Sequence, residues 1–167
     1  MKKIILVLLL SFMSLWGGGI IEGEKILDFK LKSINGQKLY SLEAFRGEVI
    51  FLNLWGSWCR GCKKEMPHFF RLQKEYEDKA FKIVTVNIDG KKRNIKKFLH
   101  KIEKKTTIKT PFLVLYDPKK NVAKNYKVRA MPSSYLIDKE GIVRLVLIGS
   151  LDEDDIKELK KEIDALL

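Results

Sequence analysis

Cysteine is scarce in this sequence, whose 167 residues include only Cys59 and Cys62. Small exported proteins that depend on disulfides for stability spread several cysteines along the chain. A disulfide across two intervening residues closes so short a loop that it removes little entropy from the unfolded chain. We therefore interpret the pair as reactive, with an inert structural bridge as the weaker alternative.

Histidine is scarce too, with only His68 and His100. A structural zinc ion takes four Cys or His ligands, and neither a second cysteine pair nor a zinc-finger spacing of histidines is present in the sequence. We expect no metal and no bound cofactor. The sequence also lacks a motif for reading nucleic acid, so we expect no nucleic-acid partner despite a formal net charge of +12.

The long uncharged run of the sequence lies at its N-terminus. Lys2 and Lys3 precede a mostly apolar stretch over residues 4–16, which is typical of a secretory signal peptide. No Ala-x-Ala-like cleavage site follows, and the uncharged stretch continues to Ile21, about the minimum for a membrane span. Residues 1–21 are therefore predicted to be a signal peptide or an uncleaved membrane anchor. Either interpretation places one domain, residues 22–167, outside the cytoplasm.

Hydrophobic periodicity predicts alternating strands and helices in this domain. Residues 48–54 are almost continuously apolar, as in a strand buried on both faces, and Asn35-Gly36 is a turn pair typical of a hairpin. The order indicates an α/β fold, with a central mixed sheet flanked by helices on both faces. After an early hairpin near residues 27–40, strands are predicted at residues 48–54, 81–88, 112–116, 134–137 and 142–148, and helices at residues 62–79, 91–105, 117–126 and 152–166.

The two cysteines are predicted to stand where a strand gives way to a helix. At a helix N-terminus the macrodipole and the unpaired backbone N–H groups stabilise a thiolate. Arg60, Lys63 and Lys64 add positive charge that acts in the same direction. Cys62, one turn into the helix, is expected to be the more buried of the two. We predict that Cys59 attacks a partner disulfide and that Cys62 resolves the mixed disulfide.

The run Trp55-Gly-Ser-Trp58-Cys59-Arg-Gly-Cys62-Lys-Lys-Glu65-Met-Pro67 resembles the active-site run of the exported TlpA/ResA-like branch of thioredoxin-fold proteins. The resemblance extends from about residue 24 to the C-terminus. It implies a thioredoxin fold with an N-terminal β extension and a central insertion, and activity as a thiol-disulfide oxidoreductase. It places Trp58, before the first cysteine, in the site. It also implies that Met131-Pro132, just before a predicted strand, is a cis bond beside the disulfide.

The resemblance further implies partners for this chemistry. Substrates would be disulfide-containing exported proteins, with apocytochrome c among the candidates. Electrons would come from a membrane thiol-electron donor such as a DsbD/CcdA-like protein. Ser133 follows Pro132, near a point where we associate an acid with the cytochrome c maturation members, and this weakens the apocytochrome assignment. We expect the protein to be a monomer.

Two polar residues lie within the predicted apolar framework. Asn53 interrupts the central strand six residues before Cys59, at the place where cytosolic thioredoxins carry a buried acid. An amide can form hydrogen bonds there but cannot take up a proton. Glu65 lies six residues after Cys59, where TlpA/ResA-like proteins carry an acid near the cysteines. Either Glu65 exchanges the proton of Cys62, or it is a solvated helix residue paired with a lysine.

The dipeptide Arg60-Gly61 departs from the Gly-Pro of thioredoxins and from the Glu-Pro common in the exported reductases. Loss of the proline loosens the turn, and the arginine favours the thiolate, so the reduced form gains stability and the protein becomes a weaker reductant. A reductase is the leading hypothesis. A disulfide oxidant or isomerase is the second, and a chaperone-like binding module switched by redox state is the third.

Basic residues gather in residues 91–105, where eight lysines and arginines accompany a single acid, Glu103. The solvated face of an amphipathic helix is the simpler interpretation. The alternative is contact with an acidic partner or an anionic membrane surface.

Overall fold

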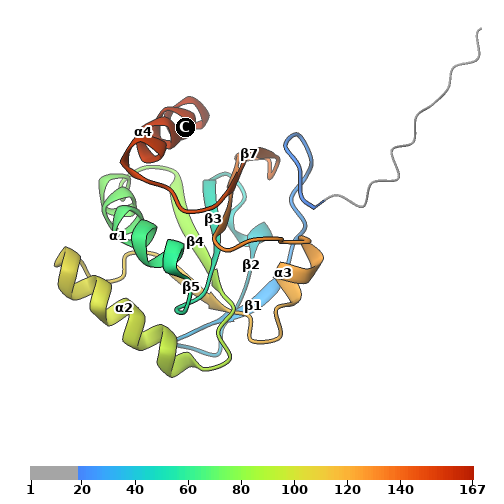
Figure 1. The fold of residues 1–167 in the computed structure, drawn as a ribbon. Helices are drawn as coiled ribbons and strands as arrows, with labels where there is room; N and C mark the ends of the chain where they lie inside the picture. Colours follow the sequence, from blue (N-terminus) through green and yellow to red (C-terminus); the bar gives the residue numbers. More distant parts are fainter. Residues whose placement is uncertain (1–18) are drawn as a thin grey trace, which may run out of the picture.

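A mixed sheet of seven strands forms the centre of the computed structural model, which describes residues 19–167 (Figure 1). The strands lie in the order β2-β1-β5-β4-β3-β6-β7. The central three are parallel to one another, and the two at each edge add antiparallel pairs. The strands are β1 (Lys30–Ser33), β2 (Leu39–Ser41), β3 (Val49–Trp55), β4 (Phe81–Asn87), β5 (Leu113–Tyr116), β6 (Ser133–Ile137) and β7 (Val143–Ile148).

Helices cover both faces of this sheet, as predicted (Figure 1). One face packs against α1 (Arg60–Glu75), α2 (Lys92–Thr106) and α4 (Glu153–Leu166). The other is covered by the short α3 (Asn121–Asn125), the 3-10 helix η1 (Leu42–Phe45) and the N-terminal segment. The pair α2–β5, between β4 and α3, accounts for the expected central insertion, and β1–β2 is the expected N-terminal extension.

Strand β3 lies in the middle of the sheet, and all seven of its residues are buried. Successive side chains of a strand point to opposite faces. Phe51, Asn53 and Trp55 therefore point to the face covered by α1, while Leu52 and Leu54 point to the other. This alternation places the one amide of the strand underneath the helix that follows the cysteines.

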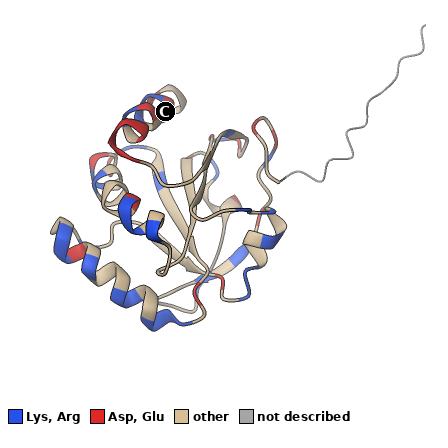
Figure 2. Cartoon of the chain, in the orientation of Figure 1, with Lys and Arg blue, Asp and Glu red and all other residues tan. Residues whose placement is uncertain are grey.

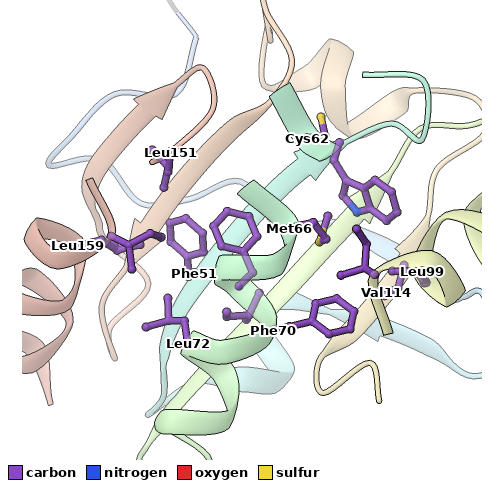
Figure 3. Packing of buried hydrophobic residues seen from close by; sticks show 14 of the residues in the cluster. Phe51, Cys62, Met66, Phe70, Leu72, Leu99, Val114, Leu151 and Leu159 are labelled. Atoms are coloured by element: carbon purple, nitrogen blue, oxygen red, sulfur yellow. The ribbon is translucent and has the colours of Figure 1, made fainter. Parts of the chain in front are cut away.

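Aromatic side chains fill the space between α1 and the sheet. Phe69 packs edge-on against Phe51, with ring centroids 5.2 Å apart, and Phe70 packs likewise against Phe112 at 5.1 Å. Figure 3 shows Met66 and Phe70 of α1 within this cluster, with Cys62 at its end nearest the start of the helix. The core thus continues up to the inner cysteine.

The predicted order of elements is confirmed, but several boundaries differ. The helix predicted over residues 117–126 is the short α3 (Asn121–Asn125), because Lys120 before it has a left-handed backbone conformation with φ of 58°. The helix predicted over residues 62–79 is α1, which begins at Arg60 and ends at Glu75. It begins earlier because Cys59 itself caps it, and it ends earlier because Tyr76 leaves helical geometry. The hairpin at Asn35-Gly36 is present, but residues 34–38 form a longer connection, and neither Asn35 nor Gly36 has the positive φ of a two-residue turn.

The acids predicted at the start of the last helix form a capping box. Asp152 accepts hydrogen bonds from the backbone N–H groups of Asp154 and Asp155, and Asp155 accepts one in return from the N–H of Asp152. These bonds satisfy N–H donors that have no partner within the helix, and they fix the point where α4 begins. The residue just before this cap, Leu151, takes part in the site described below.

The predicted signal peptide or anchor falls almost entirely on residues 1–18, outside the described residues. Within residues 19–167, no helix combines the length and the apolar character needed to cross a membrane.

Candidate active site

The two cysteines lie at the junction between β3 and α1 and form a disulfide with their Cα atoms 5.3 Å apart. Cys59 is the N-cap residue of α1, with extended backbone angles. Its Sγ accepts a hydrogen bond of 3.1 Å from the backbone N–H of Cys62. The outer sulfur therefore lies where backbone donors and the positive end of the helix dipole stabilise negative charge.

Exposure distinguishes the two sulfur-bearing residues. Cys59 retains 5% of its surface exposed, whereas Cys62 is completely buried. The side chain of Trp58, just before Cys59, is 60% exposed. Its indole lies directly over Gly56, so closely that a Cβ atom at position 56 would come within 2.7 Å of the ring. A partner that approaches the disulfide thus meets Cys59 and an exposed aromatic surface first.

The peptide bond Met131-Pro132 is cis, as the family resemblance implied, and Pro132 is buried beside the disulfide turn. A Cβ atom on Gly61 would lie 3.1 Å from Pro132 Cδ and 3.1 Å from Ser150 Cβ. Glycine at position 61 therefore lets the proline loop and Ser150 approach the turn between the cysteines. Met131 is half-buried and packs against the cores on both faces of the sheet.

Glu65 is completely buried, on the turn of α1 that follows Cys62. One carboxylate oxygen accepts a hydrogen bond of 3.1 Å from Asn53 Nδ2, and the other accepts one of 3.2 Å from the backbone N–H of Leu151. Burial raises the pKa of Glu65 to about 7, against the opposing effect of these two hydrogen bonds. The alternative of a solvated glutamate paired with a lysine is wrong, because the core of the domain covers the side chain.

Asn53 connects Glu65 to the strand that follows the cis proline. Its Nδ2 also donates to Ser134 Oγ at 2.9 Å, and within the described residues its Oδ1 has no hydrogen-bond partner. The Asn53 amide can form a hydrogen bond with Glu65 in either protonation state. Its Nδ2 donates to the carboxylate, and after a flip of the amide its Oδ1 accepts from the carboxylic acid.

Sequence reasoning missed the residue that holds the loop before the cysteines. Asp89 follows β4 and is buried, and its two oxygens accept hydrogen bonds of 3.1 and 3.2 Å from the backbone N–H of Ser57. Its own N–H donates to Asn87 Oδ1 at 2.8 Å. The available signal was topological: β3 and β4 are parallel neighbours, so residues at their carboxyl ends meet at one edge.

The predicted positive charges stand on the surface near the first turn of α1. Arg60, Lys63 and Lys64 are exposed, and none of them forms an ion pair within residues 19–167. The other predicted residues converge: Trp58 and Pro132 beside the cysteines, and Glu65 with Asn53 beneath them. This arrangement is suited to thiol-disulfide exchange, because Cys59 at the helix cap keeps 5% of its surface exposed, Cys62 is fully buried, and a buried carboxyl group follows on the same helix.

Comparison with known proteins agrees with this geometry. The AhpC/TSA family matches residues 23–146 of the chain. Thioredoxin-like protein YneN of Bacillus subtilis is 34% identical over 146 residues, 87% of this chain and 81% of YneN. Thiol-disulfide oxidoreductase ResA of Geobacillus thermodenitrificans is 31% identical over 166 residues, 95% of this chain and 91% of ResA. The chain belongs to the AhpC/TSA family and to its ResA-like thiol-disulfide oxidoreductases.

A solved structure confirms the thioredoxin fold. The structure assigned as thiol:disulfide interchange protein DsbE of Chlorobium tepidum superposes with a TM-score of 0.76 at 32% identity, covering 89% of this chain and 99% of that chain. The predicted enzyme class, a protein thiol-disulfide oxidoreductase with a Cys-x-x-Cys pair, is confirmed with it. The roles of the individual residues around the pair belong to the proposal below.

The raised pKa of Glu65 predicts how stability depends on pH. Between its ordinary value of 4.5 and about 7 the folded protein binds more protons at this site than the unfolded chain, so stability falls as pH rises. Glu65→Gln removes this loss, which is of the order of 3 kcal/mol by pH 8. Urea denaturation of the disulfide form from pH 4 to 8 measures it. The matched control is Glu162→Gln on the exposed side of α4, and parallel curves for wild type and Glu65→Gln would contradict the prediction.

Proposed function

We propose that this oxidoreductase reduces disulfides in exported proteins outside the cytoplasm. The observation that carries the proposal is the unequal placement of the two sulfurs: Cys59 caps α1 beside Trp58, while Cys62 is sealed beneath it. Export is supported by Lys2, Lys3 and the apolar run over residues 4–16.

The exchange proceeds in two steps, each of which forms one disulfide bond and breaks another. In the reduced enzyme the Cys59 thiolate attacks one sulfur of the partner disulfide, which forms a mixed disulfide and releases the first partner thiolate. The Cys62 thiol then loses its proton, and its thiolate attacks Cys59 Sγ, which releases the second partner thiolate. The partner gains two electrons, the Cys59–Cys62 disulfide forms, and a dithiol donor restores the enzyme.

Glu65 is the proposed acceptor of the Cys62 proton. Both groups are fully buried one turn apart on α1, and a carboxyl group with a pKa of about 7 exchanges protons readily near neutral pH. The Asn53 amide stays in contact with Glu65 in either state, because one of its ends donates and the other accepts. Asn53 is therefore proposed as a positioning residue.

Partners follow from the same chemistry. The substrates would be exported proteins whose disulfide can reach Cys59, apocytochrome c among them, and the donor would be a membrane dithiol protein of the DsbD/CcdA type. Support comes from the relatives named ResA and DsbE. Ser133 is buried, and its hydroxyl donates to Ala130 O at 2.8 Å. This position therefore presents no carboxylate to a substrate.

Cys62→Ser is expected to trap a mixed disulfide between Cys59 and its partner, because the second attack is lost. Non-reducing electrophoresis followed by mass spectrometry of the adduct tests this. The matched variant Cys59→Ser should trap far less, since Cys62 is sealed in the core. Adducts that form mainly through Cys62 would reverse the two roles.

Glu65→Gln is expected to slow resolution at pH 7 by about 100-fold, because the nearby general base is lost. In the wild type the rate should rise with pH through about 7, as Glu65 becomes able to accept a proton, and this inflection should disappear in the variant. Stopped-flow measurement of resolution from pH 5 to 9 separates the profiles. Recovery of the inflection in Glu65→Asp would confirm a proton-accepting role, and an unchanged Glu65→Gln profile would exclude it.

The direction of electron flow is set by the reduction potential. A reductase is expected to lie closer to about −270 mV than to about −120 mV, and a value near the second would favour the oxidant or isomerase function. Arg60→Glu should lower the potential by about 10–30 mV, because it withdraws charge that favours the thiolate. Equilibration with glutathione measures both values. Arg71→Glu, farther along α1, is the matched control and should shift the potential less.

A further inference from the structure

A groove of about 390 Å³ runs between α1 and α2, beginning beside the cysteine loop. Its floor is apolar, formed by two residues of α2 that are each 7% exposed. Its walls are basic. Ser57 lies at the end near the disulfide, and Phe98 and Ile102 form the floor. Lys63 stands on the α1 wall, and Lys97 and Lys101 stand on the α2 wall.

The charge of this groove is uncompensated. Lys63, Lys97 and Lys101 are exposed, and none forms an ion pair within the part of the chain that the structure describes. The single acid of α2, Glu103, bonds elsewhere: it accepts hydrogen bonds from the backbone N–H and the hydroxyl of Thr110. Figure 2 shows that Lys and Arg recur along α2 and at the first turn of α1.

The groove is continuous with the reactive end of the molecule. The backbone N–H of Lys63 bonds to the carbonyl of Cys59 at 3.3 Å, so this wall stands one turn of α1 away from Cys59. Ser57, at the near end, lies two residues before Cys59 and next to the exposed Trp58. A partner chain whose disulfide reaches Cys59 can therefore continue directly into the groove.

We propose that this groove binds an acidic, extended segment that flanks the disulfide of the substrate protein. The inference rests on the proposed function and adds the class of sequence that the enzyme selects. Lys97 and Lys101 are separated by about 6 Å along the helix axis. Carboxylates two residues apart on an extended chain are separated by about 7 Å and face the same side, so they match this spacing. An apolar side chain beside them would contact the Phe98 and Ile102 floor.

The shape favours a peptide over a membrane as the occupant. The lysines stand on two walls around a recess, whereas binding to a lipid surface needs cations and protruding apolar side chains on one outward face. The apolar residues here are sunk into the floor. Clusters of like charge that line a recess also raise the local concentration of an oppositely charged partner and its association rate.

The test uses the reduced full-length protein and disulfide-linked peptides in three matched forms. The residues flanking the cysteine alternate with Glu in the first, Gln in the second and Lys in the third. The wild type should reduce the Glu peptide at least about tenfold faster than the Gln peptide at low salt, and the ratio should shrink at high salt. Lys97→Glu/Lys101→Glu should abolish or reverse this preference, measured as the ratio of the rates on the Glu and Gln peptides.

A double variant with the same change of charge, Lys119→Glu/Lys124→Glu, serves as the control because both residues are exposed and outside the groove. It should keep the preference for the Glu peptide. Equal rates on the Glu and Gln peptides, or a preference that survives Lys97→Glu/Lys101→Glu, would overturn the groove proposal alone. Failure to reduce any of the peptides would instead contradict the proposed function. Binding to vesicles of anionic phospholipid that is lost in Lys97→Glu/Lys101→Glu, with peptide preference unchanged, would assign the patch to a membrane.

Discussion

The buried carboxyl group of Glu65 is the interaction on which the rest of the site depends. It joins α1 to the centre of the sheet through Asn53 and to the start of α4 through the N–H of Leu151. Asn53 extends the network to Ser134, two residues after the cis proline. One side chain thereby fixes the cysteine helix, the central strand and the proline loop relative to one another. An apolar residue of similar size at position 65 would take this acceptor away from the buried donors of Asn53 and Leu151. A buried donor left without a partner costs more free energy of folding than an exposed one, which water can satisfy.

This constraint also explains why the two cysteines differ so much although only two residues separate them. Helical geometry turns Cys62 inward, onto the face where Met66 and Glu65 lie, and the apolar packing around them is continuous (Figure 3). Cys59 is outside the helix proper and caps it, so it keeps 5% of its surface exposed and its sulfur accepts the backbone N–H of Cys62. In the proposed mechanism the inner sulfur loses its proton to Glu65, which is buried with it, whereas the outer sulfur is stabilised by dipoles and nearby cations.

Much of the fold and part of the candidate site could be predicted from local sequence patterns. The rest depends on contacts between residues that lie far apart in the sequence. The cysteine pair, the helix after it and the proline before β6 can each be recognised from a short contiguous stretch of sequence. Asn53 and Glu65 each stood out in the sequence, but their contact depends on how α1 lies over β3, which the spacing between them does not determine. Asp89 could not be predicted in this way, because its partner, the N–H of Ser57, lies after the neighbouring strand β3. The sequence analysis interpreted Arg60-Gly61 as a looser turn. In the structure, the absence of a Cβ on Gly61 lets Pro132 and Ser150 pack closely against the turn.

The Glu65 network, which is proposed to handle the proton, and the groove, which is proposed to select partners, are physically separated in this molecule. Burial raises the pKa of Glu65, its hydrogen bonds with Leu151 and Asn53 act in the opposite direction, and no surface lysine contributes to the shift. The cations of the groove lie in water, where their influence falls off over about 8 Å at physiological ionic strength. Surface charge can therefore change, and with it the choice of partner, without altering the chemistry beneath the disulfide. The same separation makes it possible to measure the two properties independently, since variants of the groove leave the Glu65 network intact.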